Sequence, residues 1–382
     1  SPTEAALKIE AEALFSGPTL IRLEARSTLP PPYSLELSKR DIGSFALFGV
    51  LGFVVNTLAV LAALLTYFLS LARKEVDHLS TLIFFAVVFV LLLLDHGATG
   101  LLDEFKRGDN IRGVHNPAAL TILPYAIYFM ASLAFSLPLT AYWAAGEAVT
   151  AKYQTGRLAV FAQALRGKLF TRPVANNLAA GFLTGGFIAA LPYLFAWLGG
   201  LTTTPSDLTS IQDLFLAPMP GILAAILASI SGHFYDLLLI FAFLTPAFGA
   251  YFRTKWPRRL LLVLAGIVFL LELNPNQTTS FLLKTSVTLA VFLVFVWLYR
   301  YFDLFAVLAA NMAAALSIKA FGLLVQPAPS LHAAGIQGLV ALGLFGFLAL
   351  WLTQIAPAAE IEPRRLPYSN EFQAERERLK AE

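Results

Sequence analysis

The chain has 382 residues, of which 58% are hydrophobic and 13% are charged. That composition is too apolar for a soluble globular fold and is typical of a protein with many membrane-spanning helices. The chain contains no cysteine, which excludes disulfides, thiolate catalysis and cysteine-ligated metal clusters. The formal net charge of +3 does not indicate binding to nucleic acid, because the basic residues gather in short loops between apolar segments.

Residues 1–40 are mixed in character and read as the end of an extracytoplasmic segment. The chain begins at Ser1 without a methionine, so we expect further residues upstream. The alternating sequence TLIRLEARS, residues 19–27, predicts a short strand. The following LPPPY, residues 29–33, predicts a stiff and extended connector to the membrane domain.

Residues 41–356 are predicted to form the membrane domain. Most of their apolar segments have the length of about 20 residues that crosses a hydrocarbon core of about 30 Å. We therefore expect an all-α, polytopic transmembrane helical bundle of about nine spans. In chain order, the expected spans cover residues 43–72, 79–102, 118–146, 174–199, 219–252, 257–273, 279–299, 303–326 and 330–355.

The distribution of Lys and Arg predicts the orientation of these spans. Between Thr150 and Pro173, after the third span, there are five basic residues and no acid, and basic residues also follow the fifth, seventh and ninth spans. The loops after the fourth, sixth and eighth spans contain no Lys or Arg, and loop 103–117 has mixed charge. Because short cytoplasmic loops are enriched in basic residues, we expect the N-terminus outside and the charged tail 357–382 in the cytoplasm, as in a bacterial inner membrane protein. This alternation also requires the fifth run to be one tilted or kinked crossing, with Pro246 near its end.

Two segments outside the spans are predicted to lie at the membrane surface. Residues 155–169 combine apolar and basic side chains and predict an interfacial helix on the cytoplasmic leaflet. Residues 201–216 predict an outer surface loop with a short helix.

Small residues at a spacing of four predict close contacts between helices. Such pairs are Gly181 with Gly185 and Ala334 with Gly338. No internal repeat is evident, and the tryptophans lie mostly near the predicted membrane interfaces, as in an aromatic belt.

The apolar segment 222–243 has a polar centre. His233 and Asp236 are three residues apart, so they share one face of a helix. Polar groups at this depth normally face the bundle interior or a partner. The pair is compatible with a proton relay, a metal half-site or a cofactor ligand, but we favour a hydrogen bond that fixes helix packing. Glu147, at the inner end of the third span, is a further candidate for a buried polar site.

No metal site is predicted, because the other histidines lie at span ends or in loops and the zinc signature HExxH is absent. Ligation of a chlorin or haem needs a single imidazole, so His233 or His332 could supply one. A bound lipid is a further alternative.

Five ionisable residues lie toward the predicted outer ends of their spans. They could converge into a binding pocket or the entry to a transport pathway, but we favour the simpler interpretation that long side chains near helix ends reach water. This outer polar cluster consists of Asp95, His96, Glu272, Lys284 and Lys319.

The order of these elements resembles the CPBP family of intramembrane proteases, the CAAX-processing and bacteriocin-processing group, over residues 118–352. The resemblance rests on AAGEAVT with its basic segment, a long span containing SGHFYD, the LNPNQTTS turn and a final pair of spans around LFAVLAANMAAAL. It implies a helical bundle in which three motifs supply the catalytic groups: Glu-Glu-x-x-x-Arg, Phe-x-x-x-His and His-x-x-x-Asn or Asp.

In a first alignment, Gly232 and His233 occupy the positions of the two glutamates and Leu237 that of the arginine. No histidine follows before the NPNQ turn, where the span closes on Glu272. The last motif has Ala310 and Asn311 where a histidine is expected.

In a second alignment, Gly146 and Glu147 occupy the two glutamate positions and Ala151 that of the arginine. His233 is then the middle histidine, with Ser229 in place of the phenylalanine.

Both alignments leave catalytic positions filled by Gly, Leu or Ala, which cannot bind a proton or a metal. We therefore predict a catalytically inactive CPBP-like protein that serves as a structural or partner-binding subunit of a larger membrane complex, for example one that holds pigments or lipids. Its expected partners are the lipid bilayer and other integral membrane subunits. One alternative is an intramembrane protease with a rearranged site that uses His233, Asp236 and Glu147 or Glu272. Another is a membrane carrier.

Overall fold

The computed structural model describes residues 8–16, 19–28, 50, 54–98, 117–153, 158–198, 226–227, 234–251, 281–324 and 329–358. Within these residues, six helices are long and apolar enough to cross a membrane. They are Val54–Ala72, His78–Asp95, Tyr125–Ala151, Arg172–Phe195, Leu304–Leu324 and His332–Ile355. The membrane domain is therefore a polytopic helical bundle.

The full helices extend beyond these windows. Their bounds are α2 His78–Ala98, α4 Pro117–Tyr153, α5 Ala159–Leu165, α6 Arg172–Leu198, α9 Phe234–Leu237, the π-helix η2 Leu238–Leu244, α10 Thr245–Tyr251, α12 Phe281–Tyr301, α13 Leu304–Leu324 and α14 Pro329–Ile355. Each expected span except the sixth falls on a described helix, although the fifth and seventh are shorter apolar helices, Phe234–Gly249 and Ser286–Tyr301. The sixth, 257–273, lies outside the described residues, so the count of nine and the orientation stay predictions.

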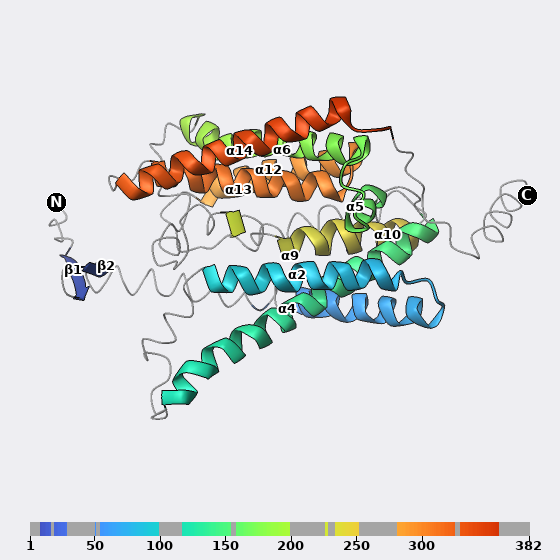
Figure 1. Ribbon diagram of the computed structural model, residues 1–382, viewed down its shortest axis with the longest axis horizontal. Coiled ribbons are helices and arrows are strands. Elements are labelled where there is room, and N and C mark those ends of the chain that lie inside the picture. The colour runs from blue at the N-terminus through green and yellow to red at the C-terminus, as the bar shows by residue number, and fades with distance from the viewer. Residues whose placement is uncertain are drawn as a thin grey trace, which may run out of the picture.

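A β-hairpin precedes the helices. Strand β1, Lys8–Ser16, pairs antiparallel with β2, Thr19–Thr28, and the register shifts at Leu14 and Phe15. The strand predicted at 19–27 is confirmed, whereas its partner β1 was not predicted. The hairpin lies at the end of the molecule where α2 ends and α4 begins (Figure 1). This placement is compatible with an extramembrane segment on that side.

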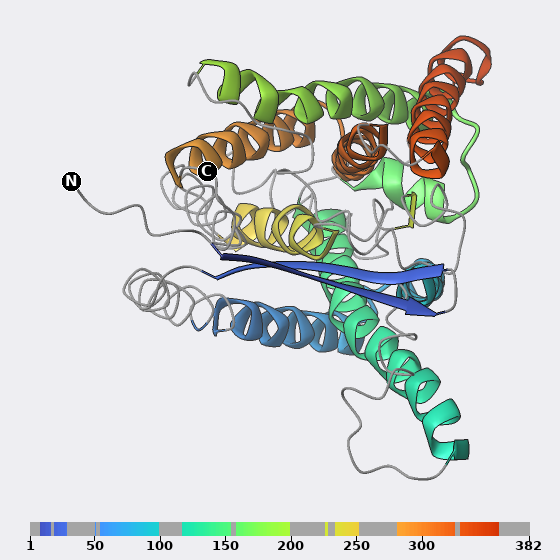
Figure 2. The ribbon, with the colours of Figure 1, turned by 90° about the vertical axis from the view of Figure 1, so that its left-hand side faces the viewer.

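Four helices, α6, α12, α13 and α14, gather on one side of the molecule and are called the C-terminal group (Figures 1 and 2). Its central helix is α13. In the membrane-spanning window of α13, 61% of the residues are buried within the chain. Close packing explains this burial, because a Cβ added to Gly181 or Gly185 of α6 would lie 2.6 Å from a carbonyl oxygen of α13. The close contact predicted for that pair is confirmed. Ala334 and Gly338 of α14 are also buried.

The helix Val54–Ala72, α2 and α4 form the N-terminal group on the other side, with η2 and α10 between the two groups (Figure 2). Here α4 and η2 approach each other closely, because a Cβ added to Gly146 would lie 1.8 Å from the carbonyl oxygen of Ala242. Only glycine permits this contact without a shift of one helix.

The irregularity expected in the fifth span lies just before Pro246, as the π-helix Leu238–Leu244. Proline has no backbone N–H and cannot donate to the carbonyl four residues earlier, which here is that of Ala242. The wider turns of a π-helix accommodate such a break. The freed carbonyl is the one that lies against Gly146.

The interfacial helix expected at 155–169 is wrong in extent and position. The helix α5 has seven residues, and the five from Val160 to Ala164 are all buried. It contacts α2, α6 and α13, so protein and not lipid covers it. Phe161 explains this position, because its ring packs edge-on against Trp143 at 4.9 Å and against Phe84 at 6.1 Å.

Candidate functional site

The main polar site lies where α2 begins and where α4 and α5 end. The Ser80 hydroxyl donates a hydrogen bond of 2.7 Å to Oε2 of the buried Glu147. Arg166 Nη2 lies 3.6 Å from Oε1 of the same carboxylate and also forms an ion pair with Asp77. These four residues, Asp77, Ser80, Glu147 and Arg166, are called the Glu147 cluster.

Local backbone structure positions the cluster. Asp77 precedes α2 and accepts hydrogen bonds from the backbone N–H groups of Leu79 at 3.2 Å and Ser80 at 3.4 Å, as an N-cap residue does. Arg166 follows α5 directly, and Gly167 after it has a φ of 82°. A glycine in this left-handed conformation is a common helix terminator, so it fixes where the arginine leaves α5.

The cluster is graded from buried to accessible. The exposed fractions of the side chains are 8% for Glu147, 19% for Asp77 and 32% for Arg166. One guanidinium therefore lies beside two carboxylates that have lost most of their water. Removing one partner from such a buried ion pair costs more free energy than the intact pair contributes, so the arrangement favours a fixed connection between α2, α4 and α5.

A second polar site, called the tyrosine pair, lies on α4 and α9. The hydroxyl oxygens of Tyr142 and Tyr235 are 2.8 Å apart, and the two rings pack edge-on. The neighbouring Asp236 is buried and close enough to interact electrostatically with both hydroxyls. The partner predicted for Asp236, His233, lies outside the described residues. The predicted pair therefore stays a prediction, and the phenols near Asp236 were not predicted.

A third polar contact joins α5 to α13. The buried Asp303 accepts a hydrogen bond from the backbone N–H of Val160 at 2.8 Å and a longer one from that of Phe161 at 3.4 Å. It also accepts one from the N–H of Leu304, at the start of α13. One carboxylate thus caps two helices. The sequence signal for the cap of α13 was an acid directly before an apolar helix. The cap of α5 joins residues that are far apart in the sequence.

Some of the positions singled out by the first family alignment are buried in the helical bundle, and the others lie outside the described residues. Leu237 and Ala310 are fully buried, and both belong to the main hydrophobic core. Asn311 is also buried, in α13. Gly232, His233 and Glu272 lie outside the described residues.

The predicted outer polar cluster is described only in part. The side chains of Asp95 and Lys319 are described, those of His96 and Lys284 are not, and Glu272 lies outside the described chain. α2 packs mainly on α4, whereas α13 packs mainly on α6 and α14. The convergence of these five residues stays a prediction.

The remaining ligand candidate, His332, is engaged in a helix connection. Its Nδ1 lies 2.7 Å from the carbonyl oxygen of Leu324 and so links α14 to the end of α13. In the part of the chain that the structure describes, no three His, Asp or Glu residues lie close enough to hold a metal ion.

The comparisons with known proteins add no relative. No family model matches the chain, and no curated protein or solved structure matches it either.

Proposed function

We propose that this chain is a catalytically inactive, CPBP-like integral membrane protein that acts as a structural or partner-binding subunit of a larger membrane complex, in the cytoplasmic membrane of a bacterium. The observation that carries the proposal is the engagement of Glu147. This is the one acid of the family motif that the second alignment retains, and it is bound by Ser80 and approached by Arg166. A carboxylate held in this way acts as a connection between helices.

The first alignment supports the same proposal. Its arginine position and one of its histidine positions are filled by Leu237 and Ala310, which are fully buried among apolar side chains. Neither residue can transfer a proton or bind a metal.

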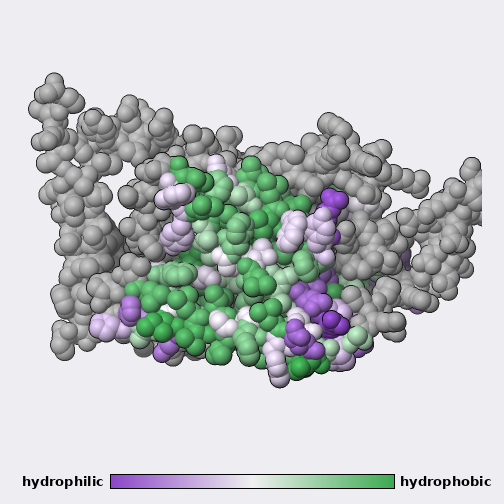
Figure 3. All heavy atoms as spheres, turned by 90° about the horizontal axis from the view of Figure 1, so that it is seen from above, coloured by the Kyte–Doolittle hydropathy of each residue, from purple (hydrophilic) through white to green (hydrophobic). Residues whose placement is uncertain are grey.

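The exposed surface supports a role in assembly. Only 17% of the window Val54–Ala72 and 22% of the windows His78–Asp95 and His332–Ile355 are buried within the chain. The described residues on the face that carries α14 are mainly hydrophobic (Figure 3). Such helices need lipid or the helices of other subunits around them.

Isolation of the full chain from its native membranes in mild detergent tests the proposal. We expect it to migrate in stoichiometric amounts with other integral membrane subunits, and Glu147→Gln to leave that complex intact because the amide oxygen still accepts the Ser80 hydrogen bond. A protein that migrates alone and cleaves membrane peptides, with the cleavage lost in Glu147→Gln, would contradict it.

The tyrosine pair favours a second candidate, an intramembrane protease with a rearranged site. Asp236 is buried and directly follows Tyr235, whose hydroxyl oxygen lies 2.8 Å from that of Tyr142, and a buried acid with hydroxyl neighbours is one arrangement for proton transfer. If this candidate is correct, His233→Ala and Asp236→Asn abolish peptide cleavage by the purified protein while its elution volume stays unchanged. If the subunit role is correct, the unmodified protein has no cleavage for these variants to remove.

A further inference from the structure

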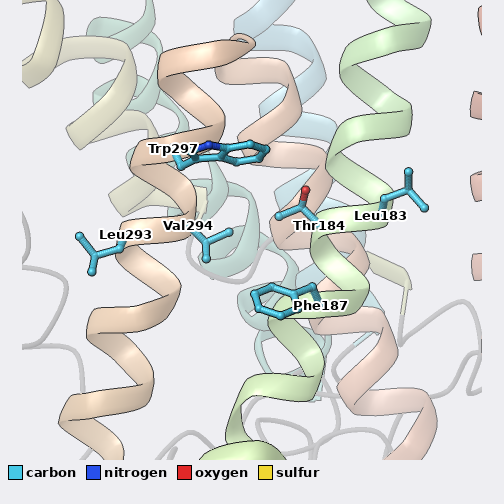
Figure 4. Close-up of a pocket in the computed structure, with 6 residues that line it drawn as sticks. All are labelled: Leu183, Thr184, Phe187, Leu293, Val294 and Trp297. Carbon is cyan, nitrogen blue, oxygen red and sulfur yellow. The ribbon is translucent and has the colours of Figure 1, made fainter.

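A groove runs between α6 and α12 on the outer surface of the C-terminal group. Its volume is about 500 Å³. Its lining residues are Leu183, Thr184, Phe187, Leu293, Val294 and Trp297 (Figure 4). The hydroxyl of Thr184 already donates a 2.7 Å hydrogen bond to the carbonyl of Ala180. The groove therefore presents an almost entirely hydrocarbon surface.

Aromatic side chains from both helices shape this groove. Trp297 extends from α12 toward α6 across one end, and Phe187 extends from α6 toward α12 nearer the other (Figure 4). Leu183 and Leu293 also line the groove and are 64% and 57% exposed. A ligand can therefore enter from the lipid phase without a movement of the helices.

The dimensions of the groove distinguish between apolar occupants. Its lining residues span one turn of each helix, which is about 6 Å along the axis. A partner helix packs along several turns, so a groove that is one turn long offers it only a short contact. A single hydrocarbon chain is flexible and can fill a groove of this length.

The end of the groove at Trp297 has the chemistry of a membrane interface. Tyr301 lies one turn further along α12, and the two aromatic rings are 5.6 Å apart. Arg300, exposed, lies in this same last turn of α12. Trp, Tyr and Arg at a helix end are typical of the headgroup region, and a cation there complements an anionic headgroup.

We propose that this groove binds one acyl chain of an anionic phospholipid, with the headgroup phosphate beside Arg300. The inference does not depend on the proposed subunit role, because it concerns the lipid face of the isolated chain.

Quenching of tryptophan fluorescence by brominated acyl chains tests the proposal. The full chain is reconstituted in phosphatidylcholine vesicles that contain increasing amounts of either dibrominated phosphatidylglycerol or dibrominated phosphatidylcholine. The difference between the unmodified protein and Trp297→Phe gives the signal of Trp297. We expect half-maximal quenching of that signal at about fivefold less phosphatidylglycerol than phosphatidylcholine, the ratio that one basic residue near the headgroups supplies.

Two variants and a control assign the effect to the groove. Arg300→Gln, at the exposed end of α12, should make the two lipids equally effective. Val294→Phe should fill the groove and reduce quenching of the Trp297 signal by either lipid. Leu348→Phe, at an exposed position of α14, should leave the quenching by both lipids unchanged. Equal quenching by the two lipids in the unmodified protein would mean nonselective surrounding lipid. No quenching by either would mean another occupant. Either result overturns the proposal.

Discussion

The two helix groups are held together by different forces. In the C-terminal group, glycines of α6 let it lie directly against the backbone of α13. In the N-terminal group, the Glu147 cluster joins the end of α4 to the start of α2 by charged and polar contacts. Van der Waals packing between two close helices can extend along their whole length, and it requires no solvent. Charged contacts belong at the helix ends, where the guanidinium of Arg166 still reaches solvent.

The largest loss of stability is expected from a large side chain at the close contact between α6 and α13 in the C-terminal group. Gly185→Leu should lower the stability by about 3 kcal/mol or more, because even its Cβ would meet the backbone of α13 at 2.6 Å. The matched control is Gly186→Leu, since a Cβ at Gly186 meets nothing within 4 Å. Thermal unfolding in detergent, followed by fluorescence, measures both. Equal losses of stability in the two variants would contradict the close-packing explanation.

The same test at the junction between groups should give a smaller loss. Gly146→Ala adds one methyl group against the carbonyl of Ala242, and η2 is already irregular and can shift. We expect a loss of about 2 kcal/mol. Gly186→Ala, as its control, should be neutral or slightly stabilising because alanine favours helix. A neutral Gly146→Ala would mean that the two helices are not in contact.

The contact between α5 and α13 comes next. Asp303→Ala leaves backbone N–H groups of both helices without their carboxylate acceptor, at an expected cost of about 1 to 2 kcal/mol. Asp303→Asn should recover part of the loss, because its amide oxygen can still accept. Chemical denaturation measures the free energy of unfolding of both variants. If Asp303 acts only by packing and not as a cap, the asparagine variant should not be more stable than the alanine variant.

The smallest effect is expected in the Glu147 cluster. A double-mutant cycle with Glu147→Gln and Arg166→Gln should give a coupling free energy of about 1 kcal/mol, since Arg166 is partly exposed to solvent. The coupling should decrease in high salt because solvent-exposed charge is screened. A coupling of zero at low salt would show that Arg166 pairs with Asp77 alone.

Local patterns in the sequence were sufficient for most of the helices. Runs of apolar residues predicted where they lie, and glycine spacing predicted a close helix contact at Gly181 and Gly185 of α6, although not that its partner is α13. The position of α5 was not predicted, because an apolar face looks the same whether lipid or protein covers it. Its partners Phe84 and Asp303 are distant in the sequence.

The polar sites were predicted only in part, for the same reason. Glu147 was identified as a candidate for a buried polar site, but Ser80 and Arg166 come from other segments, and no spacing along the chain connects them. The π-helix was anticipated only as a kink near Pro246, since proline predicts a break in the hydrogen bonding and not its form.

The carboxylate that caps α5 carries a consequence for biogenesis. Val160 and Asp303 are separated by 143 positions, so a ribosome makes the start of α5 long before its acceptor. Until the eighth predicted span enters the bilayer, those N–H groups must rely on water or on the insertion machinery. The early half of the protein thus reaches its final form only when most of the chain has been synthesised.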